Sequence, residues 1–166
     1  RSDYSKKENR MRSLESWIAE YRESHRHPVN QTIHLVCVPL ITFATLGLLA
    51  AIPVPSSIRP LPYFNWASAV AAICLVYYAS LDLRDAAGML IAVLVDLAIV
   101  ALLRRAGILL PVAGAIFTLA WIVQIYGHRV EGRSPSFLKN AVFFLIGPIW
   151  VHRKFVNGLV GSKSSV

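Results

Sequence analysis

The amino-acid sequence predicts an all-α integral membrane protein. We expect one bundle of about four membrane-spanning helices, with an interfacial helix before it and a re-entrant or interfacial helix after it. Apolar residues make up 55% of the 166 residues and charged residues only 16%, whereas about a quarter of a soluble domain is charged. The chain also contains three uncharged stretches of 22 to 24 residues, and about 20 apolar residues cross the hydrocarbon core of a bilayer.

The first predicted element lies in the polar N-terminal part of the chain. Leu14, Trp17, Ile18 and Tyr21 recur there at helical spacing, which is typical of an amphipathic helix lying on a membrane surface. The whole chain is expected to form a single membrane domain, with a helical core over residues 14–151 and flexible ends at 1–13 and 161–166.

The predicted spans follow in order at residues 35–58, 60–81, 86–103 and 106–127. Short connections between such helices predict an antiparallel up-down bundle. Only the third span contains a charge, Asp96. An ionisable residue inside a span is a functional candidate, although Asp96 could instead pair with a polar group on a neighbouring helix.

The last predicted element covers residues 140–151. This segment is too short to span a bilayer. Its Gly147-Pro148 pair is expected to break a helix, because proline lacks the backbone donor and clashes with the preceding turn. We therefore interpret the segment as re-entrant or interfacial.

The net charge of +8 could indicate nucleic-acid binding, but the basic residues flank the predicted spans. Anionic lipid headgroups attract such clusters, so membrane lipids, and no nucleic acid, are the expected partners. Seven Lys and Arg residues precede the first span, which predicts a cytoplasmic N-terminus. A bacterial inner membrane and an endoplasmic reticulum membrane both fit, and the oligomeric state stays open.

Four of the five histidines lie where an apolar segment meets a polar one: His25, His27, His34 and His128. His34 begins the first span and His128 ends the fourth, so an even number of crossings places both at one face of the membrane. Pro28 disfavours a straight helix through this region, and a break there could fold His25 back toward His34. The pattern indicates a metal site at the membrane surface, on the cytoplasmic side.

Helical spacing adds polar partners to these histidines. Residues three or four apart share a helix face, as do the pairs Tyr21/His25, Asn30/His34, Gln124/His128 and His128/Glu131. Metal-bound imidazoles are held by neighbouring hydrogen-bond partners, which Tyr21, Asn30, Gln124 and Glu131 could provide. Three histidines, or two with a carboxylate such as Glu131, leave open positions in non-haem iron(II) sites. Zinc would also be tolerated.

Other interpretations of the histidines remain. They could be interfacial and unliganded, in a non-catalytic lipid-binding protein. His34 and His128 could be axial ligands of haem in an electron-transfer bundle. His27 could be a further ligand, but Pro28 makes its phase relative to His34 unreliable. His152 stands beside Arg153 and Lys154, where contact with a lipid headgroup is the simpler interpretation.

Two motifs, Tyr21…His25-Arg-His-Pro-Val-Asn30…His34…Pro39 and Trp121-Ile-Val-Gln124-Ile-Tyr-Gly-His128…Glu131…Pro135, resemble those of the membrane 2-hydroxy fatty acid dioxygenases. The resemblance extends over most of residues 14–150. It implies an Fe(II)-dependent oxidoreductase of α-oxidation, which uses O2 to convert a 2-hydroxy fatty acid to a fatty acid one carbon shorter plus carbon dioxide.

The resemblance also implies site residues. His25, His34 and His128 match the family's histidines and become the expected Fe2+ ligands, and His27 occupies a position where the family has histidine or asparagine. The family's late acidic residue is replaced here by His152-Arg153. Arg26 and Arg129 stand beside candidate histidines in the sequence and are the expected partners of the substrate carboxylate.

Overall fold

The computed structural model describes residues 12–55 and 64–159, and helices are the only regular elements in them. The helices are α2 (Leu14–Glu23), α3 (Pro28–Ala51), α4 (Trp66–Leu81), α5 (Leu83–Arg105), α6 (Leu109–Glu131), the short 3-10 helix η1 (Ser136–Leu138) and α7 (Phe143–Leu159). The all-α prediction is therefore confirmed. The ends predicted to be flexible fall almost entirely outside the described residues.

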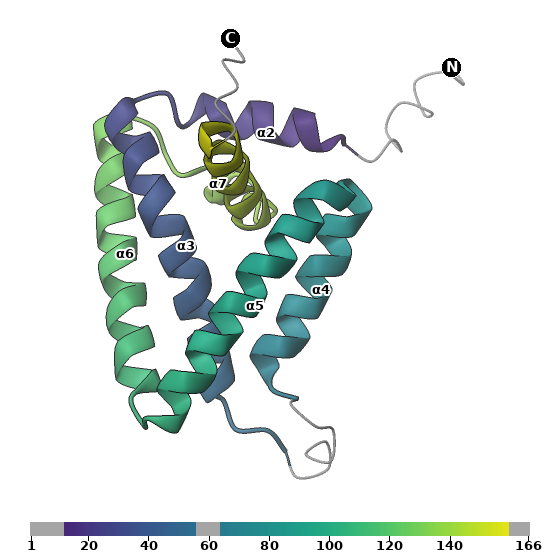
Figure 1. The fold of residues 1–166 in the computed structure, drawn as a ribbon. Coiled ribbons are helices and arrows are strands. Elements are labelled where there is room, and N and C mark those ends of the chain that lie inside the picture. Colours follow the sequence, from purple (N-terminus) through teal and green to yellow (C-terminus); the bar gives the residue numbers. More distant parts are fainter. Residues whose placement is uncertain (1–11, 56–63, 160–166) are drawn as a thin grey trace, which may run out of the picture.

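Helices α3 to α6 run up and down, as the short connections predict, and α2 lies across one end of them (Figure 1). Helix α3 lies beside α6, and α4 forms a hairpin with α5. Helix α7 packs against α2, α3 and α5 at the end of the bundle where α2 lies. Helix α2, the first turn of α3 and the last turn of α6 thus lie at the same end of the bundle.

Three helices are long and apolar enough to cross a membrane: α3, α5 and α6. The predicted second span appears as the shorter apolar helix α4, which has 16 residues. At 1.5 Å per residue this helix is about 24 Å long, less than the roughly 30 Å of a hydrocarbon core. Helix α4 begins at Trp66, later than the predicted start at residue 60, because Asn65 and Ser68 form a capping box at its first turn. This capping box provides hydrogen-bond acceptors for backbone donors there.

The prediction that Gly147-Pro148 breaks a helix is wrong. Helix α7 continues through Pro148 to Leu159. Proline removes only one backbone donor, and interior prolines are tolerated in the helices of membrane proteins; α3 likewise continues through Pro39. Gly147 also brings α7 close to α2, because a Cβ at this position would lie 3.1 Å from the Tyr21 hydroxyl.

Helices α3 and α6 approach closely at both ends of their contact. A Cβ added at Gly47 would lie 2.9 Å from the Ala113 side chain, and one added at Gly127 would lie 2.6 Å from Oδ1 of Asn30. Small residues at helix crossings allow this kind of backbone approach in membrane proteins. Gly127 precedes His128, so the closest contact of the two helices lies beside the predicted metal site.

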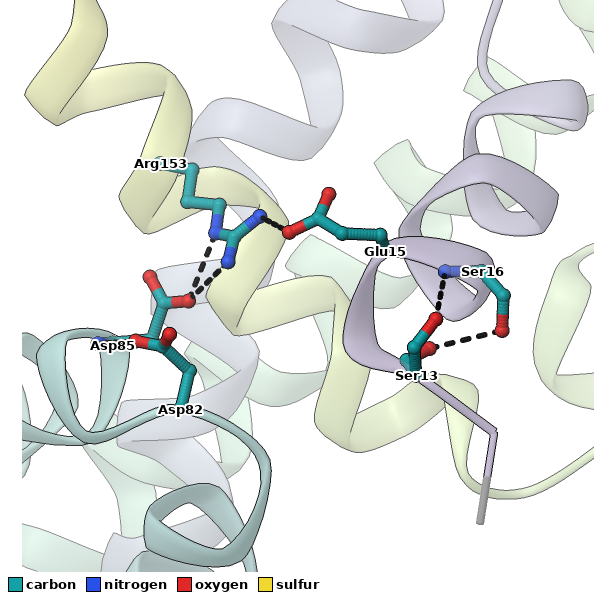
Figure 2. Close-up of polar contacts among 6 residues, drawn as sticks. All are labelled: Ser13, Glu15, Ser16, Asp82, Asp85 and Arg153. Atoms are coloured by element: carbon teal, nitrogen blue, oxygen red, sulfur yellow. Dashed lines mark hydrogen bonds and ion pairs between the residues drawn. The ribbon is translucent and has the colours of Figure 1, made fainter. Parts of the chain in front are cut away.

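An ionic network fixes the terminal helices to this end of the bundle (Figure 2). The Arg153 guanidinium of α7 lies 2.7 Å from Asp85 in the first turn of α5 and 2.7 Å from Glu15 of α2. Asp85 is buried, and its backbone N–H donates to the N-cap residue Asp82. The bonds to the Asp85 and Glu15 carboxylates raise the pKa of the Arg153 guanidinium above its usual value. Arg153 therefore joins three helices, two of which border the candidate site.

Candidate metal centre

Three histidine rings from three segments meet at the end of the bundle that α2 covers. His25 follows α2, His34 lies in the second turn of α3, and His128 lies in the last turn of α6. The ring centroids of His25 lie 4.3 Å from His34 and 5.1 Å from His128, and those of His34 and His128 are 4.8 Å apart. All three side chains are buried, with exposed fractions of 2%, 0% and 5%.

One nitrogen from each ring lies within 4.8 Å of the other two. Two imidazole nitrogens on one ion lie roughly 3 to 4 Å apart when each metal–nitrogen bond is about 2.1 Å. Small side-chain rotations would therefore bring the three nitrogens onto one ion. Within residues 12–55 and 64–159, this is the one group of three or more His, Cys, Asp or Glu side chains found to converge in this way.

His25 lies in the short non-helical segment between α2 and α3, and residues on both sides of this segment interrupt the helix. Helix α2 ends at Glu23, and α3 begins with Pro28 at its first position and His27 as its N-cap. Proline suits this position, because its missing N–H would be unpaired there in any case. The predicted break at Pro28 is thus present, and it places the His25 ring against His34.

Glu131, at the end of α6, holds this break in place. Its carboxylate accepts hydrogen bonds from the backbone N–H groups of Arg26 at 2.9 Å and His27 at 2.8 Å, and from the Asn30 side chain at 3.2 Å. A carboxylate that accepts backbone N–H bonds is strongly held. Glu131 therefore positions the segment that contains His25.

Backbone carbonyls fix the orientation of two of the rings. Nδ1–H of His25 donates to the Tyr21 carbonyl at 2.6 Å, and Nδ1–H of His34 donates to the Asn30 carbonyl at 2.9 Å. The opposite nitrogen, Nε2, then carries the free lone pair that a metal requires. Burial lowers the pKa of His25 to about 4, so this imidazole is neutral at physiological pH. The Tyr21 ring stacks on it at 4.0 Å.

The three rings line a cavity of about 50 Å³, which has room for an ion and several water-sized groups. One part of its wall is polar and includes His25, His34, His128, Gln124 and Ser136. Another part is apolar, and there α3 and α7 contribute Val38, Ile41, Phe144 and Pro148. Both a polar and an apolar group could therefore be accommodated side by side.

Unpaired buried polar atoms concentrate around this cavity. In the described residues, seven buried side-chain nitrogen and oxygen atoms have no hydrogen-bond partner, and six of them belong to residues that line the cavity. The six are Nε2 of His25, Nε2 of His34, Nδ1 of His128, Oε1 of Gln124, Nε1 of Trp121 and Oγ of Ser136. Buried polar groups are rarely left unpaired, so this concentration indicates a site that binds something polar.

The sequence pattern places Gln124 beside His128, whereas it includes Trp121 only as part of a motif, without a predicted role in the site. Trp121, Gln124 and His128 follow one another at spacings of three and four, so all three share a face of α6. This spacing could have predicted that Trp121 also lies at the site. Ser136 carried no signal, because its position depends on how the chain turns after α6.

The remaining predicted residues lie outside the cavity lining. His27 is exposed, and its ring accepts a hydrogen bond from the Val29 N–H as the N-cap of α3. Arg26 borders a large polar surface basin on the other side of His25, and Arg129 is exposed on α6.

Asp96 and His152 lie together in a separate apolar groove between α3, α5 and α7. The His152 ring packs so closely over Gly88 of α5 that a Cβ at Gly88 would lie 2.2 Å from it. This contact explains how α7 approaches α5, and it gives His152 a packing role. Asp96 is half-buried, and no ion pair is found for it among the described residues.

Comparison with known proteins places this geometry in context. The family model described as 2-hydroxy-palmitic acid dioxygenase Mpo1-like matches residues 11–159. The 2-hydroxy-palmitic acid dioxygenase MPO1 of Saccharomyces cerevisiae is 29% identical over 146 residues, which cover 86% of this chain and 79% of the yeast protein. No solved structure matches.

Proposed function

Since the chain belongs to the Mpo1-like 2-hydroxy-palmitic acid dioxygenase family, we propose that it is an Fe(II)-dependent dioxygenase acting on 2-hydroxy fatty acids. The observation that carries the proposal is the meeting of three buried histidine rings, each of which has one ring nitrogen without a hydrogen-bond partner among the described residues. Membrane lipids are the proposed surroundings, because three helices are long and apolar enough to cross a bilayer.

The donor set fits the proposed ion. His25, His34 and His128 would hold it, with His25 and His34 already turned by the Tyr21 and Asn30 carbonyls so that Nε2 is free. Three protein nitrogens leave open positions for substrate and O2. Bound Fe(II) would supply Lewis acidity and redox chemistry with O2.

The proposed reaction balances without a further reductant. A 2-hydroxy acid R–CH(OH)–COOH and O2 give R–COOH, CO2 and H2O. The bond between C1 and C2 breaks, and four electrons pass from these two carbons to O2. The substrate thus supplies every electron that O2 takes up, so no nicotinamide, flavin or 2-oxoglutarate is required.

The cavity suits one end of such a substrate. Its polar wall would receive the carboxylate and the 2-hydroxyl, and the apolar wall formed by Val38, Ile41 and Phe144 would receive the first methylenes of the acyl chain. A volume of about 50 Å³ is too small for a long chain, so the chain would continue between α3 and α7 toward the lipid. Holding the head group in this way supplies proximity and orientation at the bond that breaks.

The alternative of a haem-binding bundle fits less well. Two axial histidines stand on opposite faces of a porphyrin, whereas the rings of His34 and His128, the candidate axial ligands, lie only 4.8 Å apart. A cavity of about 50 Å³ would not hold a porphyrin. The absorption spectrum separates the two functions, because haem gives a Soret band and the proposed centre does not.

We also propose that the site faces the cytoplasm. The described basic residues at the end of the bundle that holds the site include Arg22, Arg26, Arg129, Arg133 and Lys154, whereas Arg104 and Arg105 lie at the opposite end. An excess of Lys and Arg marks the cytoplasmic side.

Metal analysis and product analysis of the purified protein test the function. The wild type should bind about one iron per chain and convert 2-hydroxypalmitic acid, in the presence of O2, to the fatty acid with one carbon fewer. His34→Ala should lose the iron and the activity, whereas His27→Ala, the matched control, should keep both. Full iron occupancy in His34→Ala would remove this residue from the ligands, and an iron-loaded wild type without product would refute the reaction.

A further inference from the structure

Three of the unpaired polar atoms around the cavity belong to side chains other than the histidines. They are Nε1 of Trp121, Oε1 of Gln124 and Oγ of Ser136. Gln124 and Ser136 are more than nine-tenths buried, with exposed fractions of 7% and 3%. A buried polar group without a partner destabilises the folded protein, so three beside one small cavity require an explanation.

The fold holds the Trp121 side chain firmly. The Trp121 ring packs edge-on against Phe137 at 5.3 Å and Phe144 at 6.0 Å, and these two rings stack on each other at 4.6 Å. This aromatic cluster fixes the direction of the indole N–H.

Ser136 reaches the cavity through a turn. Gly132 ends α6 in the left-handed conformation, with φ of 70°, which favours glycine. The chain then passes through η1, where the Ser136 carbonyl accepts a hydrogen bond from the Lys139 N–H at 3.0 Å. The Ser136 carbonyl is therefore occupied, whereas its hydroxyl has no hydrogen-bond partner among the described residues.

We propose that Trp121 and Ser136 donate hydrogen bonds to the carboxylate of the bound 2-hydroxy acid, and that Gln124 accepts a hydrogen bond from its 2-hydroxyl. The three side chains then form a head-group subsite beside the three histidines. This inference rests on the proposed function for the identity of the ligand.

The chemistry of the lining favours this assignment. An indole N–H is a donor only, and a hydroxyl can donate, so two donors from different segments suit an acceptor with two oxygens. The cavity lining contains no Lys or Arg among the described residues. Neutral donors therefore take the role that sequence reasoning gave to Arg26 and Arg129, and the metal ion would balance the negative charge. The Gln124 oxygen would distinguish a 2-hydroxy acid from a plain fatty acid, because the plain acid would leave this acceptor unpaired.

Binding without turnover tests the subsite. Trp121→Phe and Ser136→Ala would be compared with wild type for binding of radiolabelled 2-hydroxypalmitic acid to the iron-loaded protein, with O2 excluded. Trp66→Phe and Ser134→Ala are matched controls, because Trp66 donates to the Pro53 carbonyl far from the site and Ser134 is exposed. Each cavity variant should bind the acid roughly 10- to 100-fold more weakly, and each control should bind it as wild type does.

Two further readouts separate ligand binding from a structural role. Ser136→Ala removes an unpaired buried hydroxyl, so its unfolding temperature without ligand should equal or exceed that of wild type. If Ser136 were needed only for packing, Ser136→Ala would instead have a lower unfolding temperature than wild type. Gln124→Met should lose the preference of wild type for 2-hydroxypalmitic acid over palmitic acid.

The outcomes distinguish the two proposals. Wild-type affinity in both Trp121→Phe and Ser136→Ala would overturn the subsite while leaving the proposed function intact. A wild-type protein that binds palmitic acid as tightly as the 2-hydroxy acid would overturn the role of Gln124. A wild type that binds neither acid, even with iron present, would refute the proposed function itself.

Discussion

Gly127 controls how closely α3 and α6 approach beside the three-histidine site. A Cβ at this position would lie 2.6 Å from Oδ1 of Asn30 and 3.2 Å from the Ile33 side chain. Ordinary contacts of a Cβ begin near 3.4 Å, so Gly127→Ala requires a displacement of about 0.8 Å at Asn30. The Asn30 amide cannot rotate away freely, because its Nδ2 donates to the Ser24 carbonyl and to Glu131.

The displacement should reach the three-histidine site through the backbone. The Asn30 carbonyl accepts the hydrogen bond that orients His34, so moving α3 at Asn30 also moves this ring away from His128. Disturbing a group that orients a metal ligand typically lowers metal affinity 10- to 100-fold. Overpacking costs about 1 to 3 kcal/mol of stability, partly offset by up to about 1 kcal/mol from the better helix propensity of alanine.

Competition with a chelator measures the effect, followed by iron analysis of the protein. Gly127→Ala should bind iron at least about tenfold more weakly than wild type. Gly114→Ala is the control on the same helix, because a Cβ there meets nothing within 4 Å, and it should match wild type. Wild-type iron affinity in Gly127→Ala would refute the reasoning that helix separation sets the geometry of the site. An equal loss in Gly114→Ala would show that the effect is not local.

Three further predictions follow from other contacts. Glu131→Gln weakens the hydrogen bonds to the backbone of the His25 segment, so it should lower the unfolding free energy by about 1 to 3 kcal/mol and also lower the affinity for iron. The control Glu23→Gln, at an exposed position, should change neither quantity. Unchanged iron affinity in Glu131→Gln would contradict the anchoring role. Arg153→Met leaves the Asp85 carboxylate buried without its ion pair, so the unfolding temperature measured in detergent should fall. The unfolding temperature should partly recover in the double variant that also carries Asp85→Asn, and no recovery would contradict this coupling. Asp96→Asn should leave iron content and turnover unchanged, because Asp96 lines a different groove, and a loss of turnover would make Asp96 functional.

Most of the fold could be predicted from the sequence, because the feature that determines it is local. Long apolar runs predict membrane helices whatever their neighbours are, and α3, α5 and α6 satisfy the requirement of length and hydropathy. The errors concern where helices begin or continue. Helix α4 starts at a capping box, and α7 passes through Pro148, and both outcomes depend on hydrogen bonds and packing that hydropathy does not describe.

The convergence of the histidines could also be predicted, because it depends on the number of chain crossings and on one proline. An even number of helices between His34 and His128 returns the chain to the same end of the bundle, and Pro28 ends any continuous helix from His25. The contribution of Ser136 could not be predicted, because it depends on the left-handed turn at Gly132 and on the short η1 helix that follows. No periodic pattern extends across such a turn.

Glu131 explains why a motif can identify the right residue and miss its contacts. Its spacing of three residues from His128 suggests that it orients this ring, yet its carboxylate accepts hydrogen bonds from backbone N–H groups about 100 positions earlier in the chain. Any residue except proline at the positions of Arg26 and His27 would present the same backbone donors, so those two positions carry almost no sequence signal for the contact. The anchor of the His25 segment is therefore specified at the end of α6. It follows that substitutions at Arg26 should disturb the metal centre less than substitutions at Glu131, although Arg26 is the residue adjacent to His25.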